Sequence, residues 1–116
     1  MPDPLLELRD ALRAFATERD WDQFHSPRNL ATALAVEAAE LLEPFQWLTE
    51  KESGALPPEK MPAVADELAD VLLYLVRIAD KLGIDLLAAA AAKLHRNEIK
   101  YPAQRVKGSA RKYTEY

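Results

Sequence analysis

Four acidic residues stand in two pairs with the same spacing, within stretches that are otherwise apolar. Glu37 and Glu40 are the only charged residues in the stretch 29–42, and Glu67 and Asp70 precede a run of uncharged residues. A spacing of three residues places both carboxylates of a pair on one face of a helix. Four carboxylates that face one another inside a protein cannot all stay ionised without a counter-charge.

A divalent cation is the simplest counter-charge for these carboxylates, because few basic residues lie near them in the sequence. An all-oxygen ligand set favours a hard ion, so we expect Mg²⁺, with Mn²⁺ as an alternative. A ferritin-like di-iron site would carry Glu-x-x-His pairs, whereas these pairs end in Glu40 and Asp70. The predicted metal ligands are Glu37, Glu40, Glu67 and Asp70.

The same residues could carry a reaction on a polyphosphate. A bound cation would reverse the local negative charge, bridge phosphate oxygens and orient a water molecule. A carboxylate that is not fully engaged with the cation could accept the proton of that water. Glu40 is our candidate for this base, and Glu37, Glu67 and Asp70 are the other predicted catalytic residues. Asp66 points about 100° away from Glu67 on the helix and is expected on the surface.

Aromatic residues outside the acidic pairs could bind a nucleotide. Trp21, Phe24 and Trp47 lie in irregular segments that flank the helix of the first acidic pair, where aromatic rings either pack or stack on a base. Tyr74 shares a helical face with the second acidic pair. His25 is expected to be a hydrogen-bonding loop residue, because no second histidine or cysteine is spaced to join it on a metal.

Polar residues near the C-terminus offer further contacts to a nucleotide. Lys93, Asn97 and Tyr101 follow one another at i, i+4 and i+8, so they form one stripe on the last predicted helix. Lys93 could reach a phosphate, and the amide of Asn97 could read a base edge or a sugar hydroxyl. The alternative is an ordinary exposed helix end, where a lysine stabilises the helix dipole.

Helices are expected to position all these residues. Glycine is scarce and proline stands at the boundaries, which is typical of helices separated by breaks. Two of the helices are apolar on nearly every side, as buried helices are. The predicted helices are Pro4–Glu18, Pro27 to about Glu43 with Ser26 as cap, about Pro62–Leu82 ended by Gly83, and Leu86–Lys100 with Asp85 as cap.

Length and composition predict one all-α domain over residues 1–116. Of the 116 residues, 49% are hydrophobic and 29% charged, which suits a globular protein and excludes a disordered one. We expect a helical bundle to about residue 102 and a basic tail over 103–116, attached to an acidic body. A body with this charge is a poor binder of nucleic-acid polymers. No cysteine, signal peptide or membrane span is evident, so we expect a cytoplasmic protein.

The two acidic pairs resemble the signature of the MazG-like superfamily of all-α nucleoside triphosphate pyrophosphohydrolases, in particular its dCTP-hydrolysing members. The segments Trp21–His25, Pro44–Trp47, Glu67–Val76 and Lys93–Pro102 are also similar, and the resemblance covers roughly residues 5–116. It implies a four- to five-helix bundle that oligomerises through helix packing, most simply as a homotetramer.

The resemblance also implies an activity and its residues. The expected reaction cleaves a dNTP, with dCTP or a modified dCTP favoured, between the α and β phosphates to a monophosphate and pyrophosphate. Mg²⁺ would be held by the four carboxylates. The residues expected to bind the nucleotide are Trp21, Asp22, Gln23, Phe24, His25, Trp47, Tyr74, Lys93 and Asn97, to which the stripe on the last helix adds Tyr101.

Two other functions stay open at this point. Leu12 stands where the first helix of the dCTP-hydrolysing members carries a histidine that contacts substrate, so a broad-specificity MazG-type enzyme is one alternative. The other is a non-catalytic helical module whose acidic stripe docks a basic partner. Docking needs exposed charge, whereas the paired acids lie within apolar helices.

Overall fold

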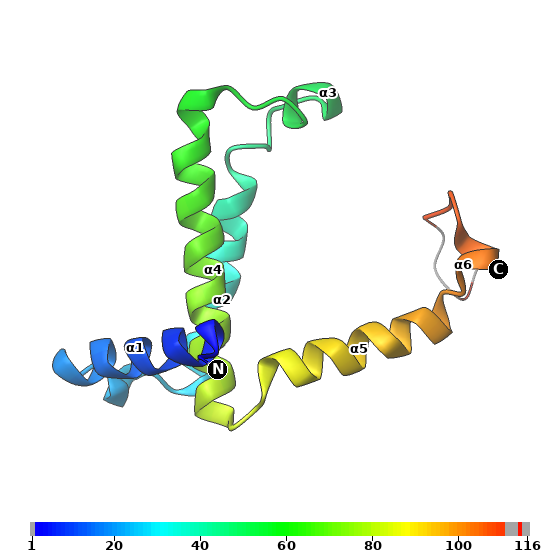
Figure 1. The fold of residues 1–116 in the computed structure, drawn as a ribbon. Coiled ribbons are helices and arrows are strands. Elements are labelled where there is room, and N and C mark those ends of the chain that lie inside the picture. Colours follow the sequence, from blue (N-terminus) through cyan, green and yellow to red (C-terminus); the bar gives the residue numbers. More distant parts are fainter. Residues whose placement is uncertain (1, 111–113, 115–116) are drawn as a thin grey trace. The chain divides into compact units, whose positions relative to one another are not determined.

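The computed structural model describes residues 2–110 and 114, and every regular element within them is helical (Figure 1). The described residues fall into two compact units, one up to Gly83 and one from Ile84 onward, and the prediction of a single domain stays a prediction. The elements in chain order are α1 (Pro4–Glu18), the 3₁₀ turn η1 (Asp22–Phe24), α2 (Pro27–Leu42), α3 (Glu50–Ser53), the 3₁₀ turn η2 (Pro58–Lys60), α4 (Met61–Leu82), α5 (Leu86–Lys100) and α6 (Ala103–Val106).

The four long helices predicted from the sequence are confirmed, and their ends are defined by local chemistry. Asp3, Ser26 and Asp85 precede α1, α2 and α5, and each side chain accepts a hydrogen bond from a first-turn backbone N–H, at 2.9, 3.1 and 3.0 Å respectively. Helix α4 ends at Gly83, whose φ of 67° is left-handed and therefore suits glycine.

Two short helices were not predicted. Helix α3 begins with a capping box, in which Thr49 Oγ1 accepts from the backbone N–H of Glu52 at 3.2 Å and Glu52 Oε1 accepts from that of Thr49 at 2.9 Å. Helix α6 lies within the predicted basic tail, and the division of the chain into a bundle and a tail stays a prediction. Positions 111–113, 115 and 116 of the predicted tail lie outside the described residues.

In the first unit, α2 packs along α4, and α1 also packs against α4 (Figure 1). The buried apolar side chains come from these three helices and are Ala16, Leu30, Val64, Val76 and Ala79. Among the described residues, no helix is both long and apolar enough to cross a membrane.

The expectation that the two central helices are buried on nearly every side is only partly correct. Val36 of α2 is 49% exposed, and Leu68 and Leu72 of α4 are 53% and 42% exposed. Two packed helices cover only the faces that they turn toward each other and toward α1. The remaining apolar faces of the described chain therefore stay open.

Candidate functional site

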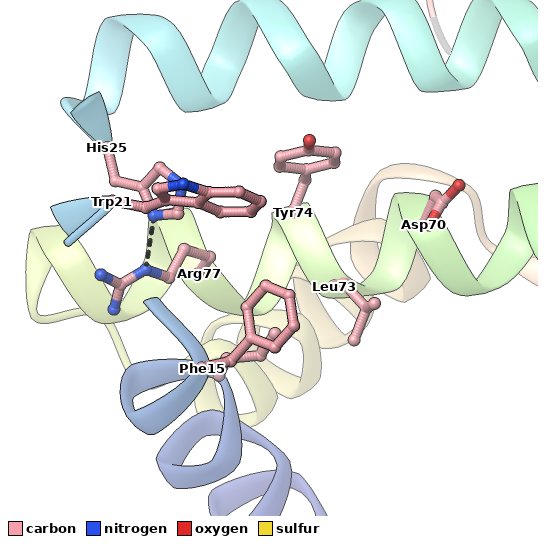
Figure 2. Close-up of a pocket in the computed structure, with 8 residues that line it drawn as sticks. Phe15, Trp21, His25, Asp70, Leu73, Tyr74 and Arg77 are labelled. Carbon is pink, nitrogen blue, oxygen red and sulfur yellow. Dashed lines mark hydrogen bonds between the residues drawn. The ribbon is translucent and has the colours of Figure 1, made fainter. Parts of the chain in front are cut away.

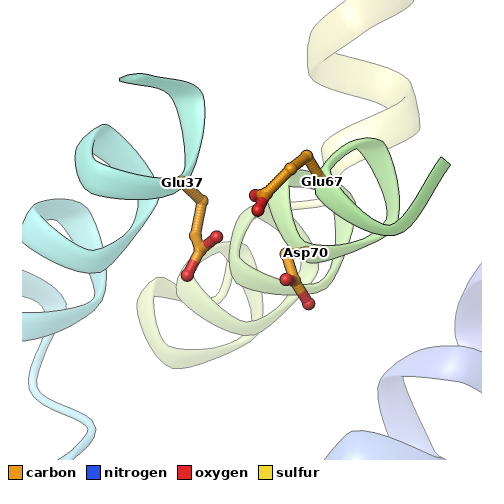
Figure 3. Close-up of side chains that lie close together, drawn as sticks. All are labelled: Glu37, Glu67 and Asp70. Atoms are coloured by element: carbon orange, nitrogen blue, oxygen red, sulfur yellow. The ribbon is translucent and has the colours of Figure 1, made fainter. Parts of the chain in front are cut away.

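The packing of α2 along α4 brings carboxylates of the two predicted pairs together. One oxygen from each of Glu37, Glu67 and Asp70 lies within 4.8 Å of the other two, and all three residues are half-buried (Figure 3). Glu40, the fourth predicted ligand, is also half-buried but lies outside this group. Asp66 is exposed, as predicted. We call Glu37, Glu40, Glu67 and Asp70 the acidic cluster.

Interactions between the carboxyl groups, together with burial, raise the pKa values of three members of the acidic cluster. The pKa of Glu37 is raised from its ordinary value, first by interaction with the carboxyl group of Glu67 and then by burial. The pKa of Glu40 is raised by the neighbouring carboxyl group of Glu37 and by its negative charge. The interaction with Glu37 is the largest single effect on Glu67 and lowers its pKa, but burial, the carboxyl group of Glu40 and the charge of Asp70 together raise the pKa of Glu67 above its ordinary value.

The cluster offers ligand atoms that fit a divalent cation. The Oε2 atoms of Glu37 and Glu67 are buried, and no described residue donates a hydrogen bond to either. A buried carboxylate oxygen without a donor is costly, and a cation bound between α2 and α4 would remove that cost. Since every available ligand atom is a carboxylate oxygen, the donor set suits Mg²⁺ or Mn²⁺.

A pocket of about 220 Å³ adjoins the acidic cluster, because Asp70 belongs to both (Figure 2). Its volume is below the roughly 300–1,000 Å³ of pockets for drug-sized ligands, so it suits a single small ring system. The lining residues come from α1, α4 and the segment around η1, and are Leu12, Phe15, Trp21, His25, Asp70, Leu73, Tyr74 and Arg77.

Aromatic rings form much of the pocket wall. The rings of Phe15 and Trp21 meet edge to face, with centroids 5.6 Å apart and an interplanar angle of 74°. The imidazole of His25 also meets the indole of Trp21 edge to face, with ring centroids 6.4 Å apart. Tyr74 projects from α4 toward the same space (Figure 2). Such a wall can take a flat, uncharged ring by stacking and by apolar contact.

Arg77 is a site residue that sequence reasoning passed over. It is only 6% exposed, and its guanidinium lies between the segment of η1 and α4. The Nε–H of Arg77 donates to Nδ1 of His25 at 3.1 Å, and its Nη2 donates to Oδ1 of Asp22 at 2.6 Å. Its Nη1 lies 3.5 Å from Oδ2 of Asp80. The sequence signal was present, since a lone cation within the apolar run of α4 needs buried partners.

Some predicted nucleotide-binding residues hold the loop before α2. Asp22 accepts hydrogen bonds from Arg77 and from Lys81, the latter at 2.5 Å, and these cations lower the pKa of Asp22. Gln23 donates to the carbonyl and carboxylate oxygens of Asp20, both at 3.0 Å. The prediction that His25 is a hydrogen-bonding loop residue is confirmed. Contact of Asp22 and Gln23 with a nucleotide stays a prediction.

Two predicted aromatic residues of the first unit lie outside the pocket wall. Phe24 is 59% exposed and Trp47 is 87% exposed, and neither lines the pocket. Lys93 and Asn97 lie on α5 and Tyr101 follows it, all in the second unit, so their role at the site stays a prediction. Leu12, at the position where the resemblance departs, lines the pocket as an apolar residue.

Known proteins resemble this chain in sequence and in structure. Residues 32–116 match the MazG-like family. The chain is 47% identical to dCTP pyrophosphatase 1 of Mus musculus over 117 residues, which cover 98% of this chain and 69% of the mouse protein. The identity and the coverage are the same for dCTP pyrophosphatase 1 of Homo sapiens. The crystal structure of a pyrophosphatase from Archaeoglobus fulgidus has a TM-score of 0.83 and 39% identity, covering 88% of this chain and 95% of that one.

Proposed function

Because the chain belongs to the MazG-like family and is a nucleotide pyrophosphohydrolase, we propose that it cleaves dCTP, or a modified dCTP, between the α and β phosphates. The products are dCMP and pyrophosphate, and the reaction depends on Mg²⁺. The observation that carries the proposal is the position of Asp70, which lies both in the acidic cluster and in the wall of an aromatic pocket. This arrangement supports binding of a base beside bound phosphates.

In the proposed mechanism, the carboxylates of Glu37, Glu67 and Asp70 hold the cation. Bound there, Mg²⁺ would supply the positive charge that offsets the phosphates and stabilises charge in the transition state. The Oε2 atoms of Glu37 and Glu67 support this assignment, because both are buried and no described residue donates a hydrogen bond to them.

Glu40 is the proposed general base. Its carboxylate lies outside the three-oxygen group but interacts with Glu37 and Glu67, so it stands beside the cation site without being required as a ligand. A carboxylate that lies beside a cation without being its ligand is free to accept a proton from water. The carboxylate of Glu40 would hold the proton of the attacking water while the bond between the phosphates breaks.

The aromatic pocket is the proposed base site. Trp21 and Tyr74 offer ring faces or edges, and stacking on one ring is worth about 1–3 kcal/mol per base. The pocket excludes water from one side of the substrate and places its phosphates toward Asp70.

We further propose a homo-oligomer, most simply a homotetramer. The open apolar side chains of Val36, Leu68 and Leu72 support it, since exposed groups of this kind mark contact surfaces. A second copy would cover these faces. Lys93, Asn97 and Tyr101 are the residues that we expect to reach bound phosphates or sugar.

The test is hydrolysis of a nucleotide panel by the purified protein. It is incubated with dCTP, 5-methyl-dCTP, dTTP, dATP and dGTP, each with Mg²⁺ or with EDTA, and the products are separated by chromatography. We expect dCMP and pyrophosphate only when Mg²⁺ is present, with the cytosine nucleotides cleaved fastest. Similar turnover of all nucleotides would favour the broad-specificity enzyme. No turnover of any nucleotide would contradict the proposal and favour the interaction module.

A further inference from the structure

The hydrogen bond between Arg77 and His25 has a consequence for the protons of the imidazole. Arg77 Nε always carries a hydrogen and can only donate, because a guanidinium does not lose its charge in proteins. At 3.1 Å from this donor, His25 Nδ1 must be the acceptor and therefore carries no proton (Figure 2). A neutral imidazole with a bare Nδ1 carries its one proton on Nε2.

The surroundings of His25 keep the ring neutral. Burial lowers the pKa of His25, and the positive charges of Arg77 and Lys81 lower it further, while the negative charge of Asp22 acts in the opposite direction. Protonation of Nδ1 would also break the hydrogen bond and set two N–H groups against each other. Both effects favour one neutral tautomer.

The Nε2–H group of His25 is available to a ligand. His25 lines the pocket beside Trp21, and no described residue accepts a hydrogen bond from its Nε2. In a small pocket, a donor with a fixed direction can discriminate between rings of similar shape.

Arg77 is itself held in place by two carboxylates. Asp22 of η1 and Asp80 of α4 both pair with its guanidinium, and Asp80 is also paired with Arg13 of α1. These ion pairs join the three elements that build the pocket wall. The packing of these elements therefore fixes the direction of the Arg77 Nε–H, and this direction in turn fixes the tautomer of His25.

We propose that Arg77 is a positioning residue that holds His25 in the Nε2–H tautomer, so that the pocket presents an N–H donor to the O2/N3 edge of a cytosine base. Cytosine has two adjacent acceptors on this edge, whereas thymine has an N–H at position 3 that would oppose the donor. The inference rests on the proposed function for its ligand, but the tautomer itself is a property of the protein alone.

The first arm of the test measures the tautomer without any nucleotide. Long-range ¹H–¹⁵N NMR distinguishes protonated from bare ring nitrogens, and the chain contains only two histidines. His95 is exposed on α5, where its Nδ1 lies 3.8 Å from the carboxylate of Glu98, and it serves as the reference for an imidazole without a donor at Nδ1. We expect His25 to show a bare Nδ1 and a protonated Nε2 at neutral pH. Protonation at Nδ1, or a charged ring, would overturn the proposal without any variant.

Two variants then test whether the hydrogen bond from Arg77, rather than positive charge near Asp22, sets the tautomer of His25. In Arg77→Met, the signals of His25 are expected to move toward a population-weighted average of the two neutral tautomers. The matched control is Lys81→Met, which removes the other cation bound to Asp22 but leaves the donor of His25 Nδ1 in place, so the tautomer should not change. An unchanged tautomer in Arg77→Met would overturn the inference.

The second arm measures kcat/KM for dCTP and dTTP with the same two variants. Arg77→Met is expected to reduce the preference for dCTP over dTTP about five- to tenfold, the scale of one net hydrogen bond. Lys81→Met should retain the wild-type ratio. An equal fall for both nucleotides in Arg77→Met would mean that Arg77 only supports the fold, and would overturn the specificity role. If the wild type hydrolyses neither nucleotide, the proposed function fails, while the NMR arm still decides the tautomer.

Discussion

Replacing Glu37 by Gln removes one negative charge from the acidic cluster and leaves the shape of the side chain nearly unchanged. The carboxyl group of Glu37 interacts with those of Glu67 and Glu40, and the pKa of Glu37 is raised by the carboxyl group of Glu67 and by burial. Without metal, the substitution removes a source of like-charge repulsion, so the free energy of unfolding should rise. With metal, it removes a ligand atom that Mg²⁺ needs.

The size of the metal effect follows from binding to the folded state alone. At a free Mg²⁺ concentration ten times the Kd, the wild type should gain about 1.4 kcal/mol of stability. In a chain of this length, 1 kcal/mol moves the Tm by about 4 °C, so the expected rise is about 5–6 °C. If loss of the Glu37 carboxylate weakens binding about a hundredfold, the same Mg²⁺ concentration raises the Tm by less than about 0.5 °C.

Thermal unfolding of EDTA-treated protein measures both effects. Melting curves are recorded without metal, with MgCl₂, and with NaCl at matched ionic strength, for the wild type, Glu37→Gln and the control Asp66→Asn. Asp66 lies next to the cluster in sequence but is exposed, so its substitution should leave the Mg²⁺ shift intact. Equal shifts in MgCl₂ and NaCl, or a full Mg²⁺ shift in Glu37→Gln, would refute the metal assignment. A metal-free Glu37→Gln protein that melts below the wild type would refute the repulsion argument.

Three further results are expected. Glu40→Gln should lower pyrophosphohydrolase turnover at least about a hundredfold, whereas the turnover of Asp66→Asn should stay within a few-fold of the wild type in the same product assay. Equal losses of turnover in the two variants would contradict the assignment of Glu40, and not Asp66, to the catalytic face. Because the pKa values of Glu37, Glu40 and Glu67 are raised above the ordinary 4.5, the stability that they contribute is present below about pH 4.5 and is lost as the pH rises through the raised values. The Tm of metal-free Glu40→Gln should therefore exceed that of the wild type by a margin that grows from pH 4.5 to 7.5, and a constant margin would argue against the coupling. Light scattering at micromolar concentration should show a homo-oligomer, and Leu72→Glu should shift it toward smaller species; a monomeric wild type would remove the proposal.

The sequence by itself determined the main helices and the faces that carry their charges. Asp3, Ser26 and Asp85 cap helices because their side chains reach first-turn N–H groups, and Gly83 ends α4 because it tolerates a left-handed backbone. These are local effects, so they can be read from neighbouring residues. The same local rule placed Asp66 away from the carboxylates of its helix. The capping box of α3 is equally local, and its pattern Thr-x-x-Glu could have predicted the start of this helix.

Only the tertiary structure decided which of these groups meet. Helical periodicity orients a side chain about its own axis, but the rotation and spacing of α2 against α4 decide that Glu37 joins Glu67 and Asp70 while Glu40 lies outside. The hydrogen bond between Arg77 and His25 joins residues 52 positions apart, and no local pattern encodes such a contact. The apolar faces that stay open follow from the number of helices available to cover them, which is a property of the packed chain rather than of any one helix.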